Sequence, residues 1–197
     1  MTDLTSKEKK LVTETWAAVM QDKSKHAITL FENIFDIAPA ARALFKFGTV
    51  SDLTTSKLAK LHAEGVMDTV DFAIQRLDNL GEVVPALQKL GTMHANYSVV
   101  PAHFPIVGQA LLKTLEDGLG EHWTPEVKAG WVKVWTTVVA VMKPELEKAI
   151  AEIEAGSGKE KGGKSVENTF SASSLKTMAV SVAVALAGFA IYVSQGV

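Results

Sequence analysis

The segment KLAKLHAEGVMDTV, residues 57–70, is the stretch from which the predicted fold of this chain follows. Its aliphatic side chains recur about every three or four residues, which is the spacing of one face of an amphipathic helix. These side chains are Leu58, Leu61, Val66 and Val70. His62 falls on the same predicted face, one turn before Val66. Because an imidazole on a buried face is costly unless it is hydrogen-bonded or ligated, His62 needs a partner.

A second histidine repeats this arrangement further along the chain. In ALQKLGTMH, residues 86–94, Leu87, Leu90 and His94 fall on one face of a predicted helix. A single histidine on an apolar face is most often a hydrogen-bonded core residue, and that interpretation stays open for each of the two. Two such residues on separate helices favour a ligand that both imidazoles share.

The composition narrows the chemistry of such a ligand. The chain has no cysteine, which excludes disulfides, thiolate metal sites, cysteine nucleophiles and covalent haem attachment through CxxCH. Zinc would require three or four ligands, and the sequence holds no His, Asp and Glu cluster of that spacing. The motifs HExxH and GxSxG are also absent. Haem iron, in contrast, needs only one protein imidazole.

The length and composition of the chain indicate one sizeable folded domain followed by an extension. The chain has 197 residues, 47% of them hydrophobic, and a net charge of −2. This balanced charge gives no support to nucleic-acid binding, which requires a strongly basic surface. The start, MTDLTSKEKK, has no apolar core of a signal peptide, and we therefore expect the N-terminal region to be cytoplasmic.

Helical periodicity runs through residues 1–150 without a convincing alternating strand, which predicts an all-α class. Hydroxyl side chains at Thr5 and Ser6 favour a first helix start there. Pro39 predicts the start of a short turn, because proline is tolerated at a first helical position. The other predicted helices cover about 24–37, the segment with His62, 83–96, 104–118 and 125–154.

The pattern as a whole resembles the globin family from about residue 4 to residue 150. LVTETWAAV resembles the first globin helix with its inward Trp16. HAITLFENIFDIAPAARALF resembles the second and third helices and ends at a haem-packing phenylalanine, Phe45. LHAEGV carries the distal pair, His62 and Val66. LGTMHANY followed by VVPAHF carries the leucine and the proximal histidine, which are Leu90 and His94 here.

The resemblance implies a globin fold of about seven to eight helices, with residues 1–154 as the haem-binding domain. It implies a non-covalent haem b whose iron is bound by His94. His62 would donate a hydrogen bond to dioxygen, or would itself ligate the iron to give a bis-histidyl haem; the sequence leaves both open. The resemblance also places the following residues around the haem: Phe31, Phe45, Val66 and Leu90.

Three departures from the family pattern lead to specific expectations. Met93 stands where oxygen carriers often have a serine that bonds the proximal ring, so we expect a backbone carbonyl to orient His94. The chain between Phe45 and His62 is short, which leaves little room for a separate fourth helix. Phe31 occupies a position often held by leucine, and its larger ring would restrict the distal pocket.

The implied function is reversible binding of dioxygen and other diatomic gases for storage, transport or sensing. The alternative is a haem redox protein with a reductase partner, such as a nitric oxide dioxygenase, nitrite reductase, peroxidase or lipid-protective enzyme. A third interpretation is a helical bundle without haem, of the Bcl-2 type. Proteins of that type carry C-terminal anchors, and the end of this chain is also hydrophobic. Their NWGR signature is absent from this chain.

The end of the chain is unlike that of ordinary globins. Residues 155–174 are rich in Gly, Ser and Lys and predict a flexible linker. Within the predicted anchor helix, 175–197, the run 178–193 carries no charge and is near the lower limit for spanning a bilayer. We expect this helix to tether the domain to a membrane, and small residues at four-residue spacing would also suit a homodimer. The alternative is a soluble helix that docks on a partner or a second copy.

Overall fold

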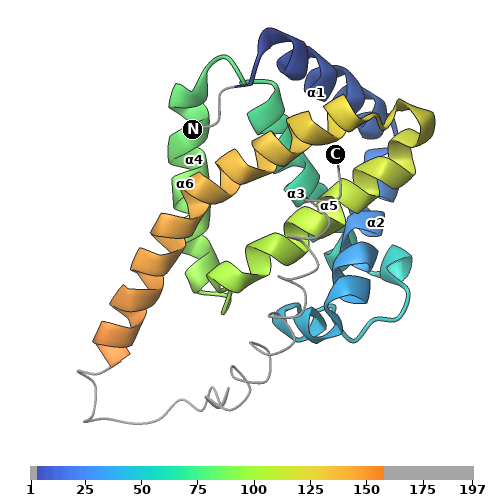
Figure 1. Ribbon diagram of the computed structural model, residues 1–197. Coiled ribbons are helices and arrows are strands. Elements are labelled where there is room, and N and C mark those ends of the chain that lie inside the picture. The colour runs from blue at the N-terminus through green and yellow to red at the C-terminus, as the bar shows by residue number, and fades with distance from the viewer. Residues whose placement is uncertain (1–3, 158–197) are drawn as a thin grey trace.

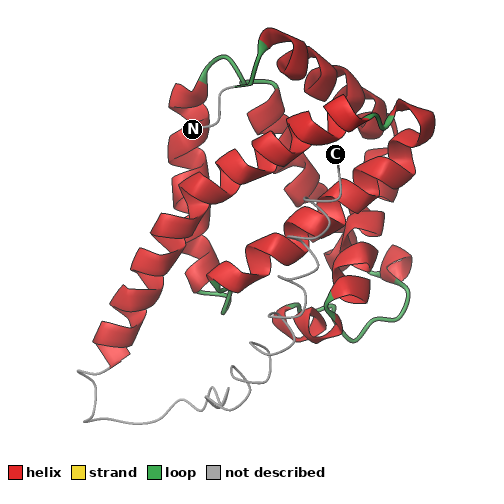
Figure 2. Ribbon diagram, viewed as in Figure 1, coloured by secondary structure: helices red, strands yellow, loops and turns green. Residues whose placement is uncertain are grey.

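A computed structural model describes residues 4–157 of the chain, and all of its regular structure in this part is helical (Figure 2). The α-helices are α1 (Ser6–Val19), α2 (Lys23–Ile37), α3 (Lys57–Ile74), α4 (Leu80–Ala95), α5 (Phe104–Leu119) and α6 (Pro125–Ser157). Short 3-10 helices lie between them: η1 (Met20–Asp22), η2 (Pro39–Leu44), η3 (Leu53–Thr55), η4 (Pro101–His103) and η5 (Gly120–His122). The predicted all-α class is confirmed. Between η2 and α3 the only helical turn is the three-residue η3, as the short spacing to His62 led us to expect.

The first helix begins where its capping residues predict. Thr5 is the N-cap of α1, and its hydroxyl accepts a hydrogen bond from the Glu8 backbone N–H at 3.2 Å. In return the Glu8 carboxylate accepts from the Thr5 backbone N–H at 2.8 Å. This reciprocal capping box satisfies two N–H groups that the helix itself leaves unpaired.

Three helix pairs position the remaining elements (Figure 1). The most extensive contact joins α4 to α6, and α2 packs against both α3 and α5. Gly91 allows the close approach of α4, because a Cβ at this position would lie 2.4 Å from the Met142 carbonyl oxygen of α6. The position of α4, and of any ligand that it carries, is therefore determined by α6.

A pair of tryptophans forms the centre of the main core. Trp16 of α1 and Trp131 of α6 are fully buried, with ring centroids 5.5 Å apart. Both indole N–H groups are satisfied, since Trp16 donates to Asp71 at 2.9 Å and Trp131 donates to Thr15 at 3.1 Å. Each ring thus buries a large apolar area without an unpaired donor.

The apolar face predicted for the helix with His62 is wrong in its register. Leu58 and Leu61 are 48% and 61% exposed, whereas the fully buried positions of α3 in that region are Ala59, Ala63 and Met67. The reason is the packing of α3 on α2, where small alanine side chains let two helices approach closely. The larger leucines are left outside this contact.

Two helix boundaries differ slightly from those predicted. We expected a helix over about 83–96, but α4 already begins at Leu80. Gly81 lies in its first turn, where backbone N–H groups lack intrahelical partners and a weak helix former is tolerable, and Glu82 is favoured there because its charge complements the helix dipole. At the other end of the domain, α6 continues to Ser157. The remainder of the predicted linker and the predicted anchor helix lie outside the described residues.

Among residues 4–157, no helix is both long and apolar enough to cross a membrane.

Candidate functional site

His94 lies in the last turn of α4, and a main-chain hydrogen bond orients its ring. Its Nδ1 is 2.7 Å from the carbonyl oxygen of Leu90, one turn earlier. A carbonyl can only accept, so Nδ1 carries a proton, and in the neutral ring Nε2 then presents a lone pair. The expectation that a backbone carbonyl would orient this ring is confirmed, and the neighbouring Met93 is 44% exposed. His94 therefore has the tautomer that a metal ligand requires.

His62 projects from α3 toward a group of phenylalanine rings. The centroid of its imidazole is 5.4 Å from that of Phe31, 5.5 Å from that of Phe45 and 5.9 Å from that of Phe47. Phe31 and Phe47 are buried, and Phe45 is half-buried. The side chain of His62 itself retains access to solvent, which corrects its predicted burial within an apolar face. Its partners are aromatic rings on one side only.

Phe47 is a site residue that the sequence analysis missed. Its ring stacks on Phe45 at 5.1 Å and also contacts Phe31 and Phe35. Neither helical nor strand periodicity could have signalled it, because Phe47 lies in a turn that is closed by the Gly48 N–H donating to the Phe45 carbonyl oxygen at 2.9 Å.

An arginine holds this aromatic group in place. The Arg42 guanidinium lies over the Phe35 ring at 4.4 Å and donates to the carbonyl oxygens of Gly48 and Val50, both at 3.1 Å. These bonds pin the loop after Phe47 back onto η2. Arg42 thus ties the loop after Phe47 to the aromatic wall near His62, which consists of Phe31, Phe45 and Phe47.

The two imidazoles lie within electrostatic reach of each other. The pKa of His62 is lowered from its ordinary value of 6.5, chiefly because the phenylalanine rings desolvate part of an imidazole that otherwise remains exposed. A positive charge on His94 lowers the pKa of His62 further. His62 is therefore neutral at pH 7, with one nitrogen that can donate and one that can accept or ligate.

The other two predicted site residues border the histidines. Val66 lies one turn after His62 on α3 and is half-buried against the main core. Leu90 is half-buried against the second core cluster, and its carbonyl is the partner of His94. The structure thus brings Phe31, Phe45 and His62 into direct contact and links Leu90 to His94. Within residues 4–157, no group of three or more His, Asp or Glu side chains is arranged to hold a metal ion.

Comparison with known proteins assigns the chain to a class. The Globin family profile matches residues 28–142. Anaerobic nitrite reductase AHB2 of Arabidopsis thaliana is 38% identical over 149 residues, which are 73% of this chain and 94% of that protein. Neuroglobin-1 of Oncorhynchus mykiss is 34% identical over 146 residues, 72% of this chain and 92% of its own length. The chain belongs to the globin family.

A solved structure agrees in fold. A hexacoordinated heme protein from an anhydrobiotic tardigrade, crystallised at pH 4, matches with a TM-score of 0.69 at 16% identity. The match covers 73% of this chain and 96% of the tardigrade protein. At this identity the likeness concerns the arrangement of the helices, and it agrees with the globin fold expected from the sequence.

Proposed function

We propose that this globin holds a b-type haem without a covalent bond and binds dioxygen and other diatomic gases reversibly. The observation that carries the proposal is the 2.7 Å hydrogen bond from His94 Nδ1 to the Leu90 carbonyl. It leaves Nε2 of an otherwise unprotonated imidazole available to iron, and the opposite helix supplies a neutral His62. This donor set fits a haem, because haem iron takes one axial nitrogen from the protein.

The chain's own residues have separate roles in this proposal. His94 binds the iron, and its bond to the Leu90 carbonyl fixes the ring and raises the basicity of Nε2. Phe45 packs on the porphyrin, while Val66 and Leu90 fill space and exclude water. When bound, the haem would supply an iron atom that can hold a small gas molecule.

His62 and Phe31 define the gas side of the site. His62 is neutral at pH 7, so one of its nitrogens can donate a hydrogen bond to a polar diatomic ligand. The same hydrogen bond is stronger in an apolar pocket than in water. Phe31 touches the His62 ring, so it limits the volume beside that donor. We infer a preference for dioxygen over ligands that cannot accept a hydrogen bond.

A second candidate function is haem redox chemistry with His62 as a sixth ligand. One observation favours it: a relative at 38% identity is named an anaerobic nitrite reductase. The tardigrade protein of similar fold is likewise described as a hexacoordinated heme protein. In this case His94 and His62 would both hold the haem, and a reductase would be the protein partner.

Absorption spectroscopy of the purified full chain tests both candidates. We expect a Soret band in the oxidised, reduced and carbon monoxide forms. The reduced form without gas then distinguishes one axial histidine from two. Production of nitric oxide from nitrite under anaerobic reducing conditions would favour the redox function over gas storage. A protein without a Soret band after addition of excess haemin would overturn the proposal.

We further propose that residues 175–197 tether the domain to the cytoplasmic face of a membrane, either as a single chain or as a homodimer. The uncharged run 178–193 and the lysines of the preceding segment support this, because lysines favour anionic headgroups. An arginine at the centre of a spanning helix costs roughly 2.5–3.5 kcal/mol in insertion assays. Leu186→Arg should therefore release the protein from the membrane fraction, whereas the matched change Lys164→Arg in the linker should not. Equal fractionation of both variants would contradict the tether.

A further inference from the structure

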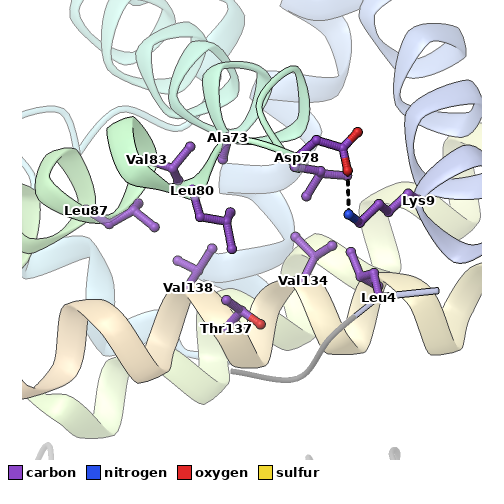
Figure 3. Close-up of a pocket in the computed structure, with 11 residues that line it drawn as sticks. Leu4, Lys9, Ala73, Asp78, Leu80, Val83, Leu87, Val134, Thr137 and Val138 are labelled. Carbon is purple, nitrogen blue, oxygen red and sulfur yellow. Dashed lines mark hydrogen bonds and ion pairs between the residues drawn. The ribbon is translucent and has the colours of Figure 1, made fainter. Parts of the chain in front are cut away.

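A cavity lies away from the two histidines. It has a volume of about 370 Å³ and lies among α1, the end of α3, the start of α4 and the middle of α6 (Figure 3). None of the six candidate haem-site residues lines it. Its walls are mainly aliphatic, and its polar lining residues are Lys9, Thr137 and Asp78.

The cavity has a polar end and an apolar end. In Figure 3 the Lys9–Asp78 ion pair lies at one end of the lining group, and Leu87 lies at the other. The Asp78 side chain is 88% exposed, so the polar end is at the protein surface. Val83 and Leu87 at the far end are buried. A cavity with one charged end and one apolar end suits a ligand that has a polar headgroup and a single alkyl chain.

The interior is poorly suited to water. Thr137 already donates its hydroxyl proton to the Lys133 carbonyl at 2.9 Å, which uses the donor of the only polar lining residue besides the ion pair. Water needs two to four polar partners to occupy a cavity, and dry apolar cavities instead bind hydrocarbons. An apolar cavity of about 150 Å³ accommodates benzene, so about 370 Å³ is enough for roughly a dozen carbon atoms.

The ion pair at the opening can receive a headgroup. Lys9 Nζ is 2.5 Å from Asp78 Oδ1, which uses one of three ammonium protons. Because the Asp78 side chain is so exposed, its pairing with Lys9 contributes little and can be exchanged for another carboxylate. Lys9 is only 33% exposed and stays at the opening.

We propose that this cavity binds a medium-chain fatty acid, with its carboxylate on Lys9 and its alkyl chain along Leu80 and Val83 toward Leu87. Apolar burial of the chain supplies the affinity, and the charge-assisted bond to Lys9 selects the headgroup. The inference concerns a site separate from the proposed haem pocket and does not depend on gas binding.

Calorimetric titration of the full chain with dodecanoate and with 1-dodecanol, both below their aggregation limits, tests the headgroup. Lys9→Met should weaken dodecanoate binding about tenfold or more and leave dodecanol binding within about twofold, since only the acid loses a charge-assisted bond. The matched control Lys10→Met changes a neighbouring lysine that pairs with Glu14 and does not line the cavity, so it should alter neither ligand. Asp78→Asn removes the competing carboxylate and should tighten dodecanoate binding.

A filled cavity tests the position of the chain. Ala73→Leu places a larger side chain inside and should abolish binding of both ligands, and Val138→Leu offers a milder change should the first variant fold poorly. A dodecanoate affinity that is unchanged in Lys9→Met and in both filling variants would overturn the proposal. So would a dodecanoate-induced displacement of the Soret band with unchanged affinity in these variants, because it would place the ligand at the haem. A colourless protein that still binds dodecanoate through Lys9 would refute only the haem function.

Discussion

The α4 side and the α3 side of the candidate haem site hold their histidines by different forces. The His94 ring is oriented by a directional hydrogen bond of 2.7 Å to its own helix. The His62 ring is positioned by T-shaped contacts with Phe31 and Phe45 and by a tilted contact with Phe47. A hydrogen bond to a main-chain carbonyl specifies one tautomer and one orientation, whereas these ring contacts specify no tautomer. The candidate site therefore has one fixed histidine, His94, and one adjustable histidine, His62.

Loss of the fixed histidine should have the largest effect. We expect His94→Ala to lose most of its haem during purification, because the only oriented iron ligand is removed. The measurement is the ratio of Soret to protein absorbance. His122→Ala, which changes an exposed histidine, serves as the matched control and should keep wild-type haem content. Equal retention in both variants would assign the iron to another residue.

The aromatic wall should matter next, and its loss should act on stability as well as on His62. Phe47 is 4% exposed, and Phe→Ala at such a position costs about 3–5 kcal/mol of unfolding free energy. Chemical denaturation measures this cost. Phe72→Ala, where the ring is half-buried under Arg76, should cost less. If both variants lose the same free energy of unfolding, Phe47 contributes no more to stability than a half-buried phenylalanine elsewhere in the fold.

Replacement of the adjustable histidine should affect ligand kinetics more than haem content. His62→Leu removes the hydrogen bond to the gas, and we expect dioxygen to dissociate about tenfold faster. Laser photolysis or stopped-flow mixing measures the rate. If His62 instead ligates iron, the same variant should convert a six-coordinate reduced spectrum into a five-coordinate one. Wild-type kinetics together with a wild-type spectrum would leave His62 without a role.

Lowering the pH should have the smallest effect on the free energy of unfolding, and it acts through the His62 ring. The pKa of His62 is lower in the folded chain than its ordinary value of 6.5, so the unfolded chain binds the proton more tightly. Its contribution to the free energy of unfolding is therefore complete above about pH 6.5 and decreases as the pH falls toward the folded pKa. Denaturation curves at several pH values should show this loss.

His26 and His103 change the free energy of unfolding with pH in the same direction as His62, because burial lowers the pKa of each. The contribution of His62 is therefore the part of the acid sensitivity that disappears in His62→Gln. An acid sensitivity unchanged in that variant would mean that the wall does not desolvate His62.

The helices and the two histidines were predictable because their signals are local. The Thr5 cap, the short turn at Pro39 and the fourteen-residue α1 follow from side chains that lie within one turn of each other. The carbonyl partner of His94 was likewise predictable, since the donor and acceptor are four residues apart on one helix. These interactions require no knowledge of distant parts of the chain.

The chain by itself thus determined an all-α globin with imidazoles on two helices. Only the tertiary structure decided which face of α3 is buried, because Ala59 and Ala63 rather than the larger Leu58 and Leu61 allow close contact with α2. It also decided that Phe47 joins the site and that a cavity opens beside Lys9. The physical reason is that packing depends on the sizes of side chains brought together from distant segments, and periodicity within one segment does not contain that information.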